Sequence, residues 1–377
     1  MEKTTILVTG GAGYIGSHVC FELLVNDFNL VVIDSLENST IDSINALSKH
    51  FKIDIPIYLG RLQDSDLMHK IFSNHKIDGV IHMAGFKSVK ESVLNPDMYL
   101  DNNLMSTISL LKIMDIYNCT NLIFSSSATV YGDRNGECFE TDPTSSLNPY
   151  GETKLLIEYI LDTCVNYSSI SKTDSIEKIS NRLLEHQNRF TMTDLKIRKD
   201  WSFISLRYFN PIGAHPSLLI GENPKGIPEN LVPYVMKVLS GDLEKLTIFG
   251  NDYDTPDGTA IRDYIHVVDL AKSHIAALKY QFENRETLSG IHERFNIGTG
   301  QGYSVLEVVN VFEKLIESEM DISLRWEIGP RRIGDSAKIF ANSNKARELL
   351  NWKPIYGLND MCRDAWEWWK LKTHVKS

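Results

Sequence analysis

Short apolar runs alternate with longer segments of helical spacing through the first half of the chain. Runs at Thr4–Thr9, Leu30–Ile33, Gly79–Met83 and Asn121–Phe124 are rich in β-branched or other large apolar residues, and a helical pattern follows each of them. Strands that alternate with helices are typical of a parallel sheet with helices on both faces. The pattern predicts an α/β fold, a doubly wound parallel sheet of Rossmann type.

The pattern changes after a buried strand at Trp201–Tyr208. Helices near 230–240, 269–281, 304–318, 344–351 and 358–371 are then mixed with short strands near 245–249, 264–267, 294–298 and 322–328. We therefore expect a first domain over 1–210 and a smaller mixed α/β lobe over 211–377, and leave open whether part of the lobe completes the first sheet. Residues 166–199 are polar and look inserted. We interpret them as a surface helical excursion, with a partner-binding element as the alternative.

The first strand leads directly into a glycine-rich turn. Gly10, Gly13 and Gly16 allow a tight turn, a close approach to a phosphate and close packing of the next helix on the strand. The N-terminus of that helix, which begins near Tyr14, would point at a pyrophosphate. Asp34 ends the next strand, where a carboxylate accepts from the adenosine ribose 2′-hydroxyl and repels a 2′-phosphate. The sequence therefore predicts an NAD site.

A tyrosine and a lysine, Tyr150 and Lys154, stand four positions apart on a predicted helix and share one face. A free tyrosine has a pKa of about 10 and is only about 0.1% ionised at pH 7. Lowering that pKa by ~3 units requires roughly 4 kcal/mol, which a fixed ammonium and a cofactor charge together could supply. The pair predicts a general base that works near neutral pH.

Two further segments follow strand ends at the same predicted edge of the sheet. Ala84–Lys87 comes after one strand, and Ser125–Gly132, with three serines and a threonine, comes after the next. Ligands bind at the carboxyl ends of strands in open α/β sheets, so these hydroxyl groups are placed to contact a substrate oxygen.

Composition narrows the function classes. The 377-residue chain has a formal net charge of −10, which argues against a nucleic-acid or anionic-membrane surface. Its five cysteines are scattered without metal-ligand spacing, so we expect no metal site and a reducing compartment. No apolar stretch approaches the ~20 residues of a membrane span. We expect a soluble, cytoplasmic protein.

In combination, these motifs resemble the extended short-chain dehydrogenase/reductase family, and within it the UDP-galactose 4-epimerases. The resemblance covers nearly the whole chain except the insertion. The matching stretches are Gly10–His18, His82–Ser92, Ser125–Gly132, Pro149–Lys154, Leu206–His215, Ile248–Asp269 and Pro330–Asp335.

The resemblance implies a reaction in which tightly held NAD transiently oxidises a UDP-hexose at C4, with no metal. Tyr150 would remove and restore the O4 proton, Ser127 would hydrogen-bond O4 with Thr129 in support, and Lys154 would bind the nicotinamide ribose. It also implies a homodimer, packed through the helix before Tyr117 and the helix that carries Tyr150. The implied cofactor-binding residues are Gly10, Gly13, Tyr14, Ile15, Gly16, Asp34, Ser35, Asn38, Arg61, Leu62, Met83, Ala84, Gly85, Lys87, Asn102, Ser127, Tyr150, Lys154 and Phe209. The implied substrate-binding residues are Lys87, Ser127, Tyr150, Asn210, Asn230, Leu231, Thr247, Phe249, Arg262, Arg332 and Asp335.

Two positions depart from the family pattern. The family usually has Gly-Asp after the third strand, where the acid meets the adenine amine, and this chain has Gly60-Arg61. An arginine there could instead stack on the adenine ring. Ile339 stands where the family varies between a bulky tyrosine and a small cysteine, and the small residue goes with acceptance of N-acetylated sugars. Isoleucine is intermediate in size, so the acceptance of these sugars stays open.

Other functions share this fold. A nucleotide-sugar dehydratase or decarboxylase would use the same cofactor and the same Tyr/Lys pair, but typically places an acid beside the active-site serine or threonine. The segment Ser127–Val130 contains no acid. A catalytically silent NAD-binding sensor is the non-enzyme alternative, against which the joint presence of Ser127, Tyr150 and Lys154 argues.

Overall fold

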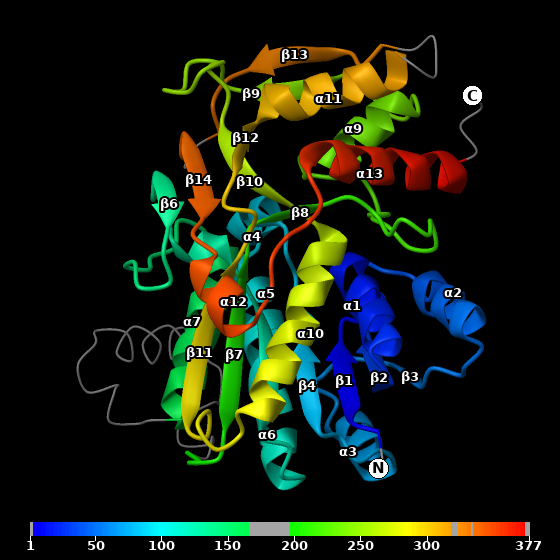
Figure 1. Ribbon diagram of the computed structural model, residues 1–377, viewed down its shortest axis with the longest axis vertical. Coiled ribbons are helices and arrows are strands. Elements are labelled where there is room, and N and C mark those ends of the chain that lie inside the picture. The colour runs from blue at the N-terminus through cyan, green and yellow to red at the C-terminus, as the bar shows by residue number, and fades with distance from the viewer. Residues whose placement is uncertain (1–2, 166–196, 318–322, 333–334, 374–377) are drawn as a thin grey trace.

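The computed structural model describes residues 3–165, 197–317, 323–332 and 335–373. Within them, a large parallel sheet has the strand order β11-β7-β5-β4-β1-β2-β3, and helices pack on both of its faces (Figure 1). The order reverses between β1 and β4, which creates the crevice where dinucleotides bind in doubly wound sheets. The predicted fold class is confirmed.

Most strands of this sheet contain a short apolar run, and the helix or loop after each strand returns the chain to the opposite edge. The elements of this part are β1 (Thr5–Thr9), α1 (Tyr14–Val25), β2 (Asn29–Asp34), α2 (Asp42–Phe51), β3 (Ile57–Leu59), α3 (Ser65–Asn74), β4 (Gly79–His82), α4 (Val89–Leu94), α5 (Pro96–Tyr99), η1 (Leu100–Leu104), α6 (Met105–Ile116), β5 (Asn121–Ser127), η2 (Ala128–Val130), β6 (Gly136–Cys138), α7 (Pro149–Val165), β7 (Ser202–Tyr208) and β8 (Asn210–Ile212).

The chain then builds a second, mixed part above the carboxyl edge of the large sheet (Figure 1). Its elements are α9 (Leu231–Leu239), β9 (Leu246–Phe249), β10 (Ile261–His266), α10 (Val267–Glu283), β11 (Ile291–Ile297), β12 (Gly302–Ser304), α11 (Val305–Glu317), β13 (Trp326–Gly329), β14 (Lys338–Ala341), α12 (Asn344–Leu349) and α13 (Leu358–Thr373). Strands β12, β10, β14 and β6 form one smaller sheet, with β8 also paired to β10, and β13 pairs with β9.

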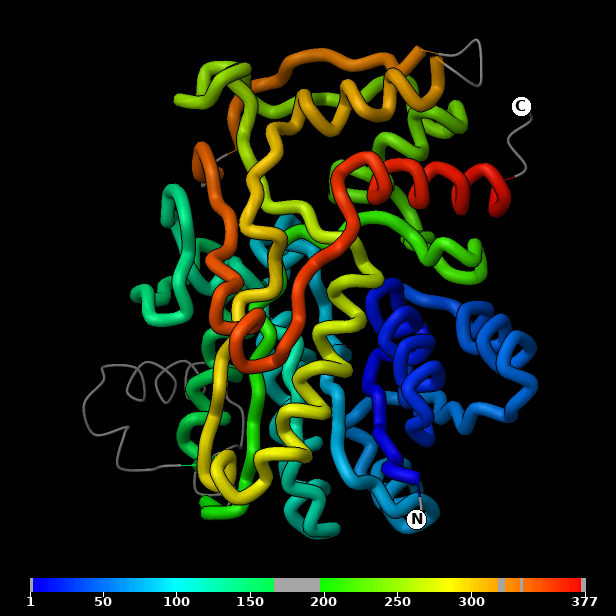
Figure 2. The backbone as a smooth tube through the Cα atoms, in the orientation of Figure 1, coloured from blue at the N-terminus to red at the C-terminus, as the bar shows by residue number. Residues whose placement is uncertain are grey.

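Two elements of this later segment pack with the first part: one joins the large sheet as a strand, and the other covers one of its faces. Strand β11 pairs in parallel with β7 along its whole length, and α10 packs beside α1 (Figure 2). The chain therefore leaves the first part after β8, returns to it with α10 and β11, leaves it again, and later packs α12 against β11.

Two apolar cores sandwich the sheet. On one face, Phe124 and Phe203 pack with Ile157 and Ile160 of α7 and with Ile108 of α6. On the other, Ile123, Ile204 and Leu206 pack with Val19 of α1 and Leu278 of α10. Because alternate residues of a strand face opposite sides, the two cores fix the register and hold the strand ends at one edge.

The structure adds local detail that the pattern did not give. The helical segment from Pro96 to Ile116 contains a π-helical segment, η1, and a separate α4 precedes it. The strand that begins at Asn121 extends to Ser127, and so brings the serines into the sheet. Short strands such as β6 and β12, which no pattern marked, complete the smaller sheet. The excursion expected at 166–199 lies almost entirely outside the described residues.

Candidate active site

The glycine turn between β1 and α1 is compressed against the end of β4. A Cβ atom at Gly10 would lie 2.9 Å from the Ala84 nitrogen, and one at Gly16 would lie 2.2 Å from the Gly10 carbonyl oxygen. Gly10 also has a φ of +73°, in the left-handed region that favours glycine. Gly13 caps α1 without a side-chain hydrogen bond, so the first N–H groups of the helix are left for another acceptor. These residues fit a pyrophosphate.

The carboxylate of Asp34 lies beside this turn at the end of β2. It accepts hydrogen bonds from the Ala12 N–H (3.0 Å), the Leu36 N–H (2.8 Å) and the Ser39 hydroxyl (3.0 Å). The side chain is therefore locked in the position where the ribose of a dinucleotide is bound in this fold, and the neighbouring Ser35 and Asn38 lie in the same loop.

Arg61 follows β3 and forms an ion pair with Glu37, on the loop after Asp34. The Arg61 side chain is 62% exposed. The structure thus pairs Arg61 with a carboxylate from the neighbouring loop, where the sequence had suggested stacking on adenine. Leu62 is buried in the core with Ile71 and Leu104, so only its backbone is available to a ligand.

The loop after β4 is held by an asparagine that sequence reasoning missed. Asn103 accepts from the Phe86 N–H (2.7 Å), donates to the Phe86 carbonyl (3.0 Å) and donates to the Thr153 hydroxyl (3.2 Å). Asn102, which was expected to contact the cofactor, donates to the Asn103 side chain at 3.1 Å. Both lie in the π-helical segment, and such bulges are frequent at functional sites. Asn103 therefore ties the Met83–Lys87 loop to the helix of Tyr150.

Ser127, Tyr150 and Lys154 come together at the carboxyl edge of β5. The Ser127 side chain lies next to the Tyr150 hydroxyl, whose pKa it lowers, and accepts from the Thr129 N–H at 3.3 Å. The Lys154 ammonium nitrogen lies 5.9 Å from the centre of the Tyr150 ring and donates to the Ser125 carbonyl at 2.7 Å. The Thr129 hydroxyl oxygen is buried without a hydrogen-bond partner among the described residues. A buried hydroxyl of this kind is suited to an oxygen of a ligand.

The pKa values of the pair differ from the expectation. Burial raises the pKa of Tyr150 to about 12, opposed by the side chain of Ser127. Burial also lowers the pKa of Lys154 to about 7. The protein's own groups therefore hold Tyr150 protonated, and the depressed tyrosine pKa expected from the sequence is not produced by Lys154 alone. The desolvation of both groups outweighs their attraction at this separation.

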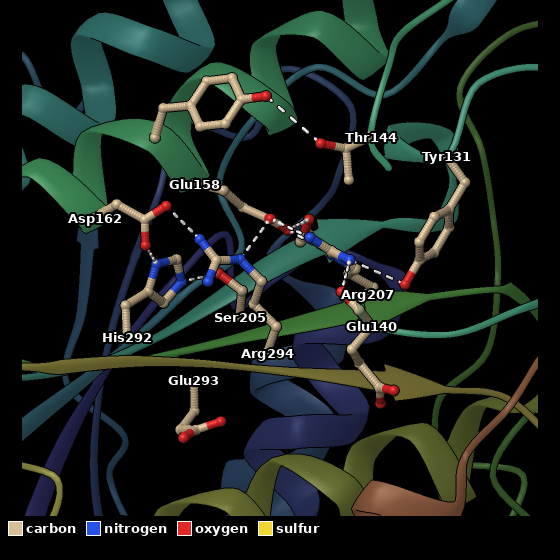
Figure 3. Close-up of polar contacts among 12 residues, drawn as sticks. Tyr131, Glu140, Thr144, Glu158, Asp162, Ser205, Arg207, His292, Glu293 and Arg294 are labelled. Carbon is tan, nitrogen blue, oxygen red and sulfur yellow. Dashed lines mark hydrogen bonds and ion pairs between the residues drawn. The ribbon is translucent and has the colours of Figure 1, made fainter. Parts of the chain in front are cut away.

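A buried ionic cluster lies beside α7, and its first residue on that helix is one turn beyond Lys154 (Figure 3). Glu158 accepts from Arg207 at 2.7 and 3.0 Å and from Arg294 at 3.1 Å, and it also accepts from the Ser126 hydroxyl at 2.6 Å. Arg294 pairs further with Asp162. Although burial alone would raise it, the pKa of Glu158 is held at about 2 by the hydrogen bonds and charge of Arg207 and by Arg294. The cluster joins α7, β5, β7 and β11.

The residues expected to hold the substrate gather mostly in the second part of the chain. Arg332 lies over the Phe249 ring at 4.2 Å, and Arg262 forms an ion pair with Asp335 at 3.3 Å. Asn230 caps α9 just before Leu231, and Thr247 precedes Phe249 by two residues on β9, so both side chains leave the same face of that strand. Lys87 reaches Glu222 at 3.3 Å, which links the β4 loop to this part.

Phe209 and Ile339 belong to one apolar cluster, which also contains Ala128 and Val130 of the turn after Ser127. Phe209 is buried with Val130 and Tyr131, and Ile339 packs against the same cluster. Asn210 follows Phe209 and is exposed at the start of β8. The position that varies in the family is therefore next to the turn that carries Thr129.

Neither a metal centre nor a membrane span is found in the part of the chain that the structure describes. There, no three histidine, cysteine or acidic side chains are grouped to hold an ion. Within the same ranges, every helix is too short or too polar to span a bilayer. All five cysteines are buried, unpaired thiols.

Comparisons with known proteins agree with this geometry. The model of the GDP-mannose 4,6 dehydratase family matches residues 7–199, and that of the NAD dependent epimerase/dehydratase family matches residues 191–298. The chain is 45% identical to UDP-glucose 4-epimerase GEPI48 of Cyamopsis tetragonoloba, over 98% of this chain and 95% of that protein.

Solved structures give the same result. The UDP-glucose-4-epimerase of Stenotrophomonas maltophila, solved with NAD and formylated UDP-arabinopyranose, is 38% identical with a TM-score of 0.82, over 99% of this chain and all of that one. The Bifidobacterium longum enzyme, in complex with NAD+ and UDP, is 39% identical with a TM-score of 0.80, over 98% of both chains. On full-length similarity in both sequence and structure, the chain belongs to the UDP-glucose 4-epimerase family.

Proposed function

We propose that this protein is an NAD-dependent UDP-glucose 4-epimerase, an isomerase that interconverts UDP-galactose and UDP-glucose. The observation that carries the assignment is the proximity of Ser127 to the Tyr150 hydroxyl at the carboxyl edge of the sheet, with Lys154 beside them and the glycine turn after β1 at the same edge. This arrangement places one proton-transferring group and one cofactor cradle at the same edge, as hydride chemistry at a sugar carbon requires.

The cofactor cradle is formed by the glycine turn with Tyr14 and Ile15, by Asp34 and its loop, and by the Met83–Lys87 loop. Bound NAD supplies a reversible acceptor for the hydride of sugar C4 and a positive charge next to Tyr150. That charge adds to the Lys154 ammonium and lowers the tyrosine pKa toward neutrality, which burial in the protein alone does not allow.

The roles of the protein groups follow from their positions. Tyr150 takes the O4 proton and later returns it, while Ser127, next to the Tyr150 hydroxyl, hydrogen-bonds O4. The Thr129 hydroxyl, buried without a partner among the described residues, supports the same oxygen. With NAD bound to accept and give back the hydride, the 4-keto sugar would turn within the site, so that proton and hydride would return to the other face of C4.

The second part of the chain binds the nucleotide. Arg262 and Arg332 offer paired N–H donors to a diphosphate, and Phe249 offers a flat surface to uracil. In the structure Arg262 engages Asp335 and Arg332 covers Phe249, so we expect both side chains to change partners when a nucleotide sugar binds.

The test is the conversion of UDP-galactose to UDP-glucose by purified protein without added NAD, with cofactor assayed after denaturation. Conversion with about one NAD per chain supports the proposal, in keeping with a tightly retained cofactor. A Tyr150→Phe protein that keeps NAD but loses turnover supports the base assignment, and unchanged turnover would refute it. Bound NAD without conversion points to another nucleotide sugar.

The favoured second substrate class is UDP-N-acetylhexosamine. Ile339 packs with Val130, Tyr131 and Phe209, close to where the sugar would lie, and its size is between that of tyrosine and cysteine. Whether the pocket accepts an N-acetylated sugar is tested by comparing kcat/KM for UDP-galactose and UDP-N-acetylgalactosamine in the wild type and in Ile339→Cys. If kcat/KM rises in the variant for the N-acetylated sugar only, the Ile339 side chain limits the size of the pocket.

We further propose a homodimer in the cytoplasm. Val93, Leu94 and Met98 are exposed large apolar side chains on α4 and α5, beside α7, one of the two helices expected at the interface. Five buried free thiols suit a reducing compartment. Light scattering on wild type and Leu94→Glu tests the assembly, and a dimeric variant would exclude Leu94 from the interface.

A further inference from the structure

The loop between β8 and α9, residues 213–230, contacts the cofactor cradle at several points, although the proposed reaction assigns no step to it. Two of these contacts are made to the start of α1 and to the loop after β2. The Gly213 carbonyl accepts from the Tyr14 hydroxyl at 2.7 Å. Lys225 donates to the Leu36 carbonyl at 2.7 Å.

The same loop also contacts the chain after β4. Glu222 pairs with Lys87 at 3.3 Å, and Glu229 accepts from the hydroxyl of Ser88, the N-cap of α4, at 2.5 Å. Strands β4, β1 and β2 are neighbours in the large sheet, so the loop spans the carboxyl ends of all three, a distance of about 10 Å. It lies above α1 (Figure 2). The loop therefore crosses the crevice in which this fold binds a dinucleotide.

The contact made by Lys225 bears directly on the carboxylate expected at the ribose. The Leu36 N–H donates to the Asp34 carboxylate at 2.8 Å, while the Leu36 carbonyl accepts from Lys225. The same ammonium also donates to the Glu37 carbonyl at 3.3 Å. Lys225 thus holds two successive carbonyls of the loop that orients Asp34.

The first half of the loop is anchored in the apolar core. Ile220 is buried in the core on the α1 side of the sheet. The ring of His215 packs on Phe21 of α1, with 3.9 Å between the ring centres. This half cannot leave the protein without exposing apolar surface, and it fixes one end of the loop.

The second half, residues 222–229, is attached differently. Within the described part of the chain, no backbone–backbone hydrogen bond involves these residues. Ile227 is 71% exposed. The side chains of Glu222, Lys225 and Glu229 are therefore its main attachments, and such a segment can open locally while the core stays folded.

A reaction that oxidises and then reduces the same cofactor within one turnover contains no step in which the cofactor leaves. We propose that residues 222–229 form a strap across the cofactor crevice, in which Glu222, Lys225 and Glu229 are positioning residues that slow the dissociation of NAD. The strap must detach from the loops after β2 and β4 before the dinucleotide can leave. The proposal rests on the proposed function only in taking NAD as the bound group.

The test measures the release of NAD and not turnover. Purified holoprotein is mixed with excess alcohol dehydrogenase and ethanol, which reduce each released NAD, and the absorbance of the NADH formed gives the rate. We expect Lys225→Met to release NAD about 5-fold faster than wild type, because two hydrogen bonds from the ammonium are lost. Adding Glu229→Ala should raise the rate further, to about 10–20-fold.

Two variants serve as controls. Lys225→Arg keeps N–H donors at the end of a long side chain, and we expect it to release NAD at close to the wild-type rate. Lys279→Met is the matched control. Lys279 is also exposed and also joins the later segment to the first part, because it donates to the Asn26 side chain at 2.8 Å, but Asn26 lies at the end of α1 opposite the glycine turn. We expect Lys279→Met to leave the release rate unchanged.

The outcomes separate the strap from the reaction. A release rate that is unchanged in Lys225→Met/Glu229→Ala, or that rises equally in Lys279→Met, overturns the strap. If the wild type holds NAD but converts no nucleotide sugar, the proposed function fails, whereas the release rates still decide the strap.

Discussion

Helix α7 carries two buried charges one turn apart, and their surroundings differ completely. Glu158 is bonded to Arg207, Arg294 and Ser126, and its pKa falls to about 2. Lys154 contacts a hydroxyl, a carbonyl and an aromatic ring, but among the described residues it pairs with no carboxylate. Burial lowers its pKa to about 7. A buried charge with matched partners is fixed, and one held only by dipoles can be tuned by what binds next to it.

The largest effect should come from breaking the matched cluster. Arg207→Met leaves the Glu158 carboxylate buried with part of its compensation removed, and we expect a loss of about 3–5 kcal/mol of unfolding free energy. Urea denaturation measures it. The double variant Arg207→Met/Glu158→Leu should recover most of the loss, since Arg294 keeps Asp162. A single variant as stable as wild type would show that the cluster is not a structural anchor.

Removing the Lys154 charge should lower turnover without lowering stability. Lys154→Met deletes a buried cation without a carboxylate partner, so the unfolding free energy should stay equal or rise. Turnover should fall by about 10²–10⁴-fold, because the proton transfer through Tyr150 loses its supporting charge. Urea denaturation and steady-state kinetics on one preparation test both halves. A variant that loses stability along with turnover would place Lys154 with Glu158 as a structural charge.

The pH dependence of stability separates the two charges further. The folded-state pKa of Lys154, about 7, is below the ordinary lysine value of about 10.4, so between these values the unfolded chain binds more protons and stability rises with pH. The slope is at most about 1.4 kcal/mol per pH unit for one proton. Glu158 has the reverse sign, since its contribution is present above about pH 4.3 and is lost as pH falls toward 2.

Between pH 7 and 10, therefore, the difference in stability between wild type and Lys154→Met should change with pH, whereas the difference between wild type and Arg207→Met should be nearly constant. Urea midpoints across this range provide the measurement. Parallel curves for wild type and Lys154→Met would mean that the lysine titrates normally in the folded protein.

The smallest effect concerns a neutral contact on the same helix. Thr153→Val removes an acceptor from Asn103 and should cost about 1 kcal/mol more than Thr163→Val. Both threonines donate to a carbonyl of the preceding turn, and this makes Thr163 a matched control. If the two substitutions lower the unfolding free energy equally, the Asn103–Thr153 hydrogen bond does not help to position α7.

The sequence predicted the parts of the molecule that depend on neighbours along the chain. Apolar runs such as Leu30–Ile33 mark strands, and Asp34 follows from its spacing after the glycine turn, because each obeys a local rule. The family and the fold were recognised from such motifs and are confirmed. The roles assigned to individual site residues stay predictions.

The sequence could not show which residues, far apart along the chain, contact one another in the fold. Glu158 meets Arg207 and Arg294 because α7, β7 and β11 pack together, and Asn103 meets Thr153 through a π-helical segment that has no periodic signal. One signal was present: Glu158 stands between the apolar pairs Leu156-Ile157 and Ile160-Leu161, in a stretch of the helix rich in large apolar residues. A charge there requires a buried counter-charge, although sequence does not say which.

The late return of the chain to its first sheet has a consequence for biosynthesis. Strand β7 leaves the ribosome long before β11, which covers its open edge, and α10 also follows late. A nascent chain that ends near residue 250 has an apolar strand with unpaired backbone groups, a feature that promotes aggregation. We therefore expect this intermediate to depend on chaperone protection during translation, and a fragment cut at residue 210 to be insoluble when expressed alone.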